Sequence, residues 1–192
     1  ENGTASSFTI DLNADGTPTE LGDNDHWGYD PSSGGQLYLY NGGFTLKPSS
    51  ESGAESALQG VELIINQDAD FADGTVGCWT NNAGIISGGT FQKAVHNDAT
   101  PNNQGFILDG IFKEQVHNWG TISGGIFQGE VHNWGTISGG TFEEVVEMNE
   151  SPEGAKIEGG TFKKGIELNA YFPTITIKDG LFDGEVSAAE GY

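Results

Sequence analysis

The sequence has no arginine, a single cysteine and no apolar run long enough to cross a membrane. Its 192 residues include 28 Asp and Glu against seven basic residues, all of them Lys, which gives a formal net charge of −21. Such a chain is repelled by nucleic acid and by anionic membrane surfaces, where binding depends on Lys and Arg. A transmembrane helix requires about 18 consecutive apolar residues. We therefore expect neither nucleic-acid binding nor membrane insertion.

The lone Cys78 excludes an internal disulfide framework and a CxxC metal site. This fits either a cytosolic protein or a secreted one that is stabilised by stacking of its strands. Glycine and aromatic residues are abundant instead, with 31 Gly, 11 Phe and 4 Trp, as is typical of many short strands joined by glycine turns. The composition favours a secreted or cell-surface location. Glu1 is not an initiator residue, which is consistent with removal of a leader peptide.

A short repeat organises the chain. Residues 117–125 and 132–140 are identical, HNWGTISGG, and varied forms bring the number of aligned copies to six. Each copy has a Phe, a Gly two residues before it, an Ile five residues before it and a Val or Ile four residues after it; the Phe residues are Phe91, Phe112, Phe127, Phe142, Phe162 and Phe182. All extra residues fall between the Val and the next Ile, in 96–105, 147–155 and 167–174. We expect these insertions to leave one lateral edge of the fold.

A unit this short cannot bury its own apolar side chains and needs neighbours stacked on it. The apolar spacing indicates three short faces joined by corners, where Gly supplies the positive φ. The sequence therefore predicts an all-β fold, a single-stranded parallel β-helix with coils of 15–21 residues, which we expect to be right-handed. A β-sandwich would not keep three apolar columns in register. We expect an N-terminal capping segment over 1–36, irregular coils over 37–82 and regular coils with the C-terminal end over 83–192.

The residue after each Val should point outward, and it reads His96, His117, His132, Glu147, Glu167 and Ser187 along the copies. Neighbouring His residues could share a transition metal, with Glu extending the site. A regular ladder places its ligands in a line rather than a tetrahedron, however, which favours a solvated polar stripe.

Two further columns follow the His column. Trp119 and Trp134 occupy equivalent positions in adjacent copies, where stacked indoles could form a platform for sugar rings or fold over the corner and pack. A second column, Asn97, Asn118 and Asn133, predicts an Asn ladder at a turn.

Residues 11–16 read D-x-N-x-D-G, the first half of a calcium loop of the EF-hand type. The spacing puts the oxygens of Asp11, Asn13 and Asp15 on one side of a tight turn. The twelfth position of the loop is Gly22, where an EF-hand has Glu. The alternatives are a calcium site and an Asx-rich turn without metal.

The GTISGGTF-x-G-x-V-x-N pattern, over residues 83–187, resembles the repeats of parallel β-helix proteins of bacterial surfaces, both adhesin-like and pectate-lyase-like. The resemblance implies secretion and contact with carbohydrate or host surfaces. The lyase relatives use a Lys or Arg base, often with calcium, and the hydrolase relatives place several Asp on one coil face. Here Arg is absent and the Asp residues Asp98, Asp109, Asp179 and Asp183 are spread over different offsets in the repeat, three in all. The resemblance therefore transfers no catalytic residue.

These observations predict a secreted or cell-surface structural or interaction module, adhesin-like, rather than an enzyme. Its expected partners are an extracellular polysaccharide or a glycan or protein of a host surface. The expected contacts are Trp119 and Trp134, together with His117 and His132. The alternative is a polysaccharide-binding or polysaccharide-degrading β-helix protein.

Overall fold

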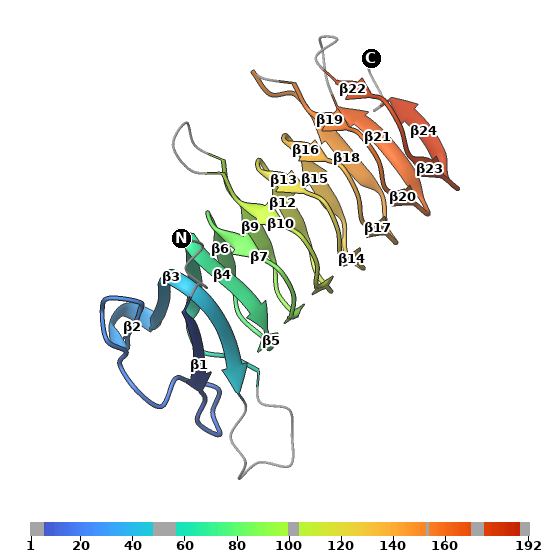
Figure 1. Ribbon diagram of the computed structural model, residues 1–192. Helices are drawn as coiled ribbons and strands as arrows, with labels where there is room; N and C mark the ends of the chain where they lie inside the picture. Colours follow the sequence, from blue (N-terminus) through green and yellow to red (C-terminus); the bar gives the residue numbers. More distant parts are fainter. Residues whose placement is uncertain (1–5, 48–56, 100–103, 153, 170–174, 189–192) are drawn as a thin grey trace.

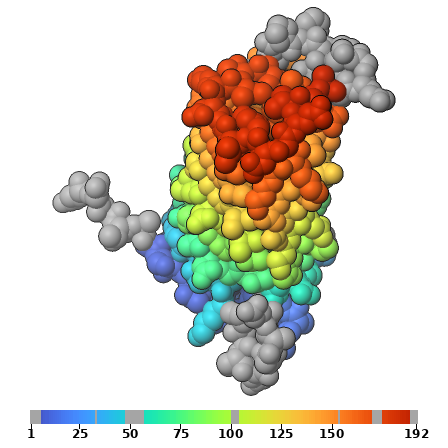
Figure 2. All heavy atoms as spheres, turned by 90° about the vertical axis from the view of Figure 1, so that its right-hand side faces the viewer, coloured from blue at the N-terminus to red at the C-terminus, as the bar shows by residue number. Residues whose placement is uncertain are grey.

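The computed structural model describes residues 6–47, 57–99, 104–152, 154–169 and 175–188. They form a parallel β-helix whose coils stack along one axis, from β1–β3 at one end to β22–β24 at the other (Figure 1). The one helical element in this part of the chain is a 3₁₀ turn, η1 (Ser32–Gly34). Seen from the side, the coils make one continuous column in chain order (Figure 2). The predicted fold class is therefore confirmed.

Each coil contributes strands to three faces. Face 1 carries the Val-His-Asn segments: β6 (Thr80–Asn82), β9 (Val95–Asn97), β12 (Val116–Asn118), β15 (Val131–Asn133), β18 (Val146–Asn149), β21 (Gly165–Asn169) and β24 (Glu185–Ala188). Face 2 carries the Ile column: β7 (Ile85–Ile86), β10 (Phe106–Ile107), β13 (Thr121–Ile122), β16 (Thr136–Ile137), β19 (Lys156–Ile157) and β22 (Thr176–Ile177). Face 3 carries the Phe column: β5 (Thr75–Val76), β8 (Thr90–Phe91), β11 (Ile111–Phe112), β14 (Ile126–Phe127), β17 (Thr141–Phe142), β20 (Thr161–Phe162) and β23 (Leu181–Phe182).

Faces 1 and 2 belong to one bent sheet of 17 strands, and face 3 is a separate sheet of seven strands. Faces 1 and 2 are joined at the N-terminal end, where β3 (Gln36–Lys47) and β4 (Glu62–Asp73) each run across these two faces. The first part of β4 pairs with β6 of face 1, and its last part pairs with β7 of face 2. These long strands occupy the region expected to hold irregular coils.

The N-terminal segment covers one end of the solenoid. Strand β1 (Ser7–Asp11) pairs parallel to β3 and β2 (Trp27–Asp30) pairs antiparallel to it. Ile10, Leu12 and Trp27 are buried against the core of the first coils. The antiparallel strand β2 is a feature that the repeat pattern does not predict.

The interior consists of side-chain columns in register. The rings of Phe127 and Phe142 are 4.8 Å apart and nearly parallel, and similar spacings continue along face 3. The Gly two residues before each Phe turns the chain with a positive φ, for example +104° at Gly140. A Cβ atom there would lie 3.3 Å from the ring of Phe127, so glycine satisfies both the backbone conformation and the close packing.

A buried Asn ladder runs beside the apolar columns. The Nδ2 group of each Asn donates to Oδ1 of the next, from Asn82 to Asn97 (2.8 Å), on to Asn118 (2.6 Å) and on to Asn133 (2.6 Å). All four are fully buried. The ladder ends at Met148, whose sulfur lies 3.5 Å from Asn133 Nδ2. The predicted ladder is confirmed, and Asn82 extends it by one coil.

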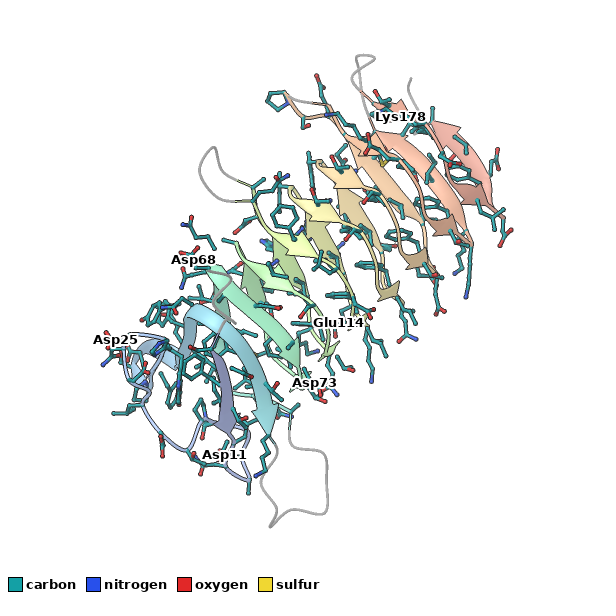
Figure 3. All side chains as sticks on the ribbon, in the orientation of Figure 1. Asp11, Asp25, Asp68, Asp73, Glu114 and Lys178 are labelled. Atoms are coloured by element: carbon teal, nitrogen blue, oxygen red, sulfur yellow. The ribbon has the colours of Figure 1, made fainter. Side chains whose placement is uncertain are left out.

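Ion pairs on the surface link equivalent positions of neighbouring coils. Lys93 lies 2.8 Å from Glu114, and Lys178 lies 2.6 Å from Glu158 (Figure 3). Lys163 pairs with Glu143, one coil away. Exposed pairs of this kind contribute only about 0–1 kcal/mol each. These Lys residues are thus paired singly with carboxylates of the neighbouring coil rather than gathered in a basic patch.

Candidate functional site

Six aromatic side chains form a continuous stripe on the outward side of face 1. We call this set the aromatic stripe: Trp79, His96, His117, Trp119, His132 and Trp134. The His residues are central in β9, β12 and β15, where the flanking Val and Asn are buried, and strand alternation turns them outward. They are in register from coil to coil. The His column of the stripe therefore follows from the repeat itself.

The two indoles Trp119 and Trp134 stack on each other. Their centroids are 4.6 Å apart and their planes differ by 7°. Two parallel indoles at this distance are too close to lie side by side in one plane, so they are stacked face to face. Trp119 is nevertheless 36% exposed and Trp134 is partly buried. The pair packs one face of each indole against the other, and Trp119 keeps more exposed area than Trp134.

The His rings continue this stack. The ring of His117 lies 5.0 Å from that of His132 in a nearly parallel orientation and 4.7 Å from that of His96, which is tilted. Trp79 meets His96 edge to face at 4.5 Å and is 43% exposed. The stripe therefore runs without interruption from the coil of Trp79 to that of Trp134.

Polar side chains fix the ring orientations. Oε1 of Gln115 lies 2.9 Å from His117 Nε2, and the amide nitrogen of Gln115 contacts Nε2 of His132. Nδ1 of His132 lies 2.9 Å from Oε2 of Glu147 in the next coil. Glu147 also accepts a hydrogen bond of 3.1 Å from Asn169. At this end the stripe passes from aromatic rings to carboxylate and amide groups.

Burial keeps two of the imidazoles neutral. It lowers the pKa of His96, opposed by the charge of Asp98. It also lowers the pKa of His117, and the neighbouring His96 and His132 lower it further. Burial raises the pKa of the Asp98 carboxyl. Near neutral pH the rings of His96 and His117 therefore each offer one N–H donor and one nitrogen acceptor.

The His column does not form a metal centre in the residues that the structure describes. No group of three or more His, Cys, Asp or Glu side chains in this part of the chain is arranged to hold a metal ion. His96, His117 and His132 lie in a line with their rings against one another. Their contacts are those of a stack rather than of a shared coordination sphere.

The D-x-N-x-D-G segment forms a turn that is held by its own hydrogen bonds. Oδ1 of Asp15 accepts from the backbone N–H (3.0 Å) and the hydroxyl (2.7 Å) of Thr17, and these bonds lower the pKa of Asp15. Asn13 Nδ2 donates to Thr17 Oγ1 at 3.2 Å. Asp11 lies apart from them at the end of β1, 3.8 Å from Nζ of Lys47 (Figure 3). Calcium binding by Asp11, Asn13 and Asp15 stays a prediction.

The corner between faces 1 and 2 holds both the Trp pair and the insertions. Trp119 and Trp134 follow β12 and β15 directly, in the two coils without an insertion. The insertions follow β9, β18 and β21 at the same corner, as expected. Parts of them, 100–103, 153 and 170–174, lie outside the described residues. The indoles thus lie between longer connections on both sides.

The Asp residues that a hydrolase would need lie at three different corners. Asp98 follows β9 on face 1, and Asp183 follows β23 on face 3. Asp109 and Asp179 lie between faces 2 and 3, where each accepts a hydrogen bond of 2.8 Å from the N–H of the next residue, a Gly. These carboxylates serve turns and do not converge on one site.

The chain matches no protein-family model, and comparisons with curated proteins and with solved structures found no match. Among the described residues no helix has the length and apolar character needed to cross a membrane. Evidence for a function therefore comes from the aromatic stripe.

Trp79 and Gln115 are the members of this region that the repeat pattern did not reveal. Their position, two residues before the outward His column, varies from coil to coil.

Proposed function

We propose that the protein is a secreted or cell-surface interaction module that contacts a glycan through the aromatic stripe. The observation that carries this proposal is the stripe itself, six aromatic rings in contact along one outward face, with Trp79 and Trp119 exposed. Exposed aromatic clusters on a soluble surface mark interaction sites. The expected partner is an extracellular polysaccharide or a host-surface glycan.

The chemistry of the stripe suits the hydroxyl groups of a neutral sugar chain. Ring edges carry partial positive charge, and the edges of Trp119 and Trp134, whose inner faces pack on each other, can meet the oxygen atoms of a ligand. His117 and Gln115 add neutral donors and acceptors, and Glu147 adds a carboxylate acceptor. We infer contact through edges and hydrogen bonds rather than through sugar rings stacked on indole faces.

The surroundings disfavour an acidic glycan. The carboxylates of Glu130 and Glu147 lie 3.9 Å and 2.9 Å from nitrogens of His132, and the whole chain carries a net charge of −21. Like charges raise the energy of an approaching uronate or sulfate group. The stripe is also rigid, since each ring is held by rings in the neighbouring coils. Little side-chain ordering is then needed on binding.

The test is a titration of intrinsic tryptophan fluorescence with neutral oligosaccharides and uronate oligomers, for the wild type and for Trp119→Ala/Trp134→Ala. We expect a neutral glycan to shift the emission, and the double variant to bind about tenfold more weakly. Ile126→Ala is the matched control, because Ile126 is 41% exposed on face 3 of the same coils. Equal loss in both variants, or no response to any glycan, would contradict the proposal. New reducing ends in the mixture would instead indicate a polysaccharide-degrading protein.

A further inference from the structure

The middle ring of the aromatic stripe, His117, has surroundings that favour its neutral form. Its ring lies between those of His96 at 4.7 Å and His132 at 5.0 Å. Its centroid is also 5.9 Å from that of Trp119 and 5.9 Å from that of Trp134. Equal distances to two rings that stack on each other place His117 beside their edges rather than over either face. Indole edges carry partial positive charge, so they repel an imidazolium.

Charged groups are present at both ends of the His column but not at its middle. On β9 and the corner that follows it, Asp98 faces His96. On the other side, Glu130 precedes β15 and Glu147 lies on β18, and both approach His132. Strand β6 contributes Asn81, and Trp79 directly precedes this strand; neither side chain titrates, although Asn81 contacts Glu62.

Among the residues that the structure describes, His117 contacts no such carboxylate. Its polar contact is Oε1 of Gln115, at 2.9 Å. Protonation of His96 places an imidazolium next to the carboxylate of Asp98, whereas protonation of His117 places it next to two imidazoles and two indole edges. Because His117 is partly buried and lies between two imidazoles, its charged form is disfavoured where it stands. We therefore expect the ring of His117 to leave its place in the stripe when it takes up a proton.

We propose that mild acid opens the aromatic stripe at His117, so that the protein holds its glycan near neutral pH and releases it in acidic surroundings. This inference rests on the proposed function, since it describes the regulation of the same site. A charged His117 moves from its place beside the Trp pair toward water. The ordered row of ring edges that contacts the ligand is then interrupted at its centre.

The experiment follows tryptophan fluorescence from pH about 7.5 to about 5.5, a range in which ordinary carboxyl groups stay ionised. It is run without ligand and with the neutral oligosaccharide that binds best, on the wild type, His117→Phe and His26→Gln. The Phe variant keeps a ring in the stack and cannot take a proton. His26 lies in the N-terminal segment 2.7 Å from Asp23, outside the stripe, and serves as the control.

We expect the wild type and His26→Gln to show a fluorescence transition in acid and to bind about tenfold more weakly there. In His117→Phe both changes should disappear, whatever its affinity at neutral pH. A wild-type affinity equal at both pH values, or an acid transition that persists in His117→Phe, overturns the inference. If no glycan binds at either pH, the proposed function fails. The fluorescence transition without ligand, present in the wild type and absent in His117→Phe, then still decides whether the stripe opens. Titration of the imidazole protons by NMR in the wild type gives the same decision if the variant does not fold.

Discussion

The Asn ladder allows a sharp test of what stabilises the interior of this β-helix. Asn118 is fully buried, accepts from Asn97 and donates to Asn133. Replacing it with Leu, which has a similar volume, removes both bonds. Asn97 then keeps its bond to the carbonyl of Gly105, but for its other N–H only the long contact of 3.5 Å to the carbonyl of Thr121 remains, so that group is effectively unpaired. Oδ1 of Asn133 loses its donor as well, so the substitution leaves two unpaired buried groups.

The magnitude follows from this count. An unpaired buried polar group costs about 1–3 kcal/mol, so Asn118→Leu should lower the free energy of unfolding by about 2–6 kcal/mol. Asn133→Leu leaves one unpaired group, on Asn118, because its other neighbour is the thioether of Met148. That variant should lose about half as much. In the double variant the unpaired group is the N–H of Asn97, so it should be more stable than Asn118→Leu alone.

The assay is urea unfolding of the three variants and the wild type, followed by tryptophan fluorescence and by far-UV circular dichroism. Coincident transitions by the two probes are needed, because solenoids can unfold in parts. A drop of about 4 kcal/mol corresponds to a decrease in Tm of about 8–16 °C for a chain of this size. Additive losses in Asn118→Leu/Asn133→Leu, or equal losses in the two single variants, would refute the account by unpaired groups.

Four further predictions concern single positions. Thr80→Val should raise the free energy of unfolding by about 1 kcal/mol, measured in urea, because the buried hydroxyl of Thr80 has no hydrogen-bond partner among the described residues and its position belongs to the Val column. Gly140→Ala should lower it by about 1–3 kcal/mol, since φ there is +104°, whereas Gly43→Ala, where the nearest atom to the Cβ position is a carbonyl oxygen 3.9 Å away, should have little effect. The pKa of His117 is lower in the folded than in the unfolded chain, so protons favour unfolding and stability falls as the pH drops through about 6.5; this fall should be smaller in His117→Phe in pH-dependent urea titrations. If calcium binds residues 11–15, Asp11→Ala or a chelator should lower the Tm, and an unchanged Tm would leave only a turn.

The interior of the fold could be predicted because every inward position is repeated. Ile122, Phe127 and Val131 have counterparts in five other coils. When coils stack in register, a column of one apolar residue type indicates a position whose side chains point inward. The Asn ladder followed for the same reason. Asn82 was missed because it precedes the first aligned copy, in a coil that lacks the Phe.

The candidate site could be predicted in its members but not in its geometry. Equivalent spacing showed that Trp119 and Trp134 are neighbours, but whether their rings lie flat or stack depends on side-chain torsion angles that the pattern does not fix. Trp79 has Ala94, Gln115 and Glu130 at its equivalent positions, so no column indicated that it joins the stripe. The turn at Asp15 has the composition of a calcium loop, and the partner that the structure gives it is Thr17.

The two short coils, those of Trp119 and Trp134, have no inserted residues at the corner between faces 1 and 2. In these coils Trp119 and Trp134 follow the strand directly and stay in register, so their rings stack at 4.6 Å. In the coils on either side, Asp98 and Asn149 occupy the same position and the chain leaves the corner in an insertion. The backbone bond of 2.8 Å from the N–H of Trp134 to the carbonyl of Asn118 has a counterpart of the same length from Trp119 to Asn97, so this bond forms whether or not an insertion follows. The absence of an insertion therefore acts on the side chains, because it leaves the two indoles of adjacent coils at equivalent positions beside each other.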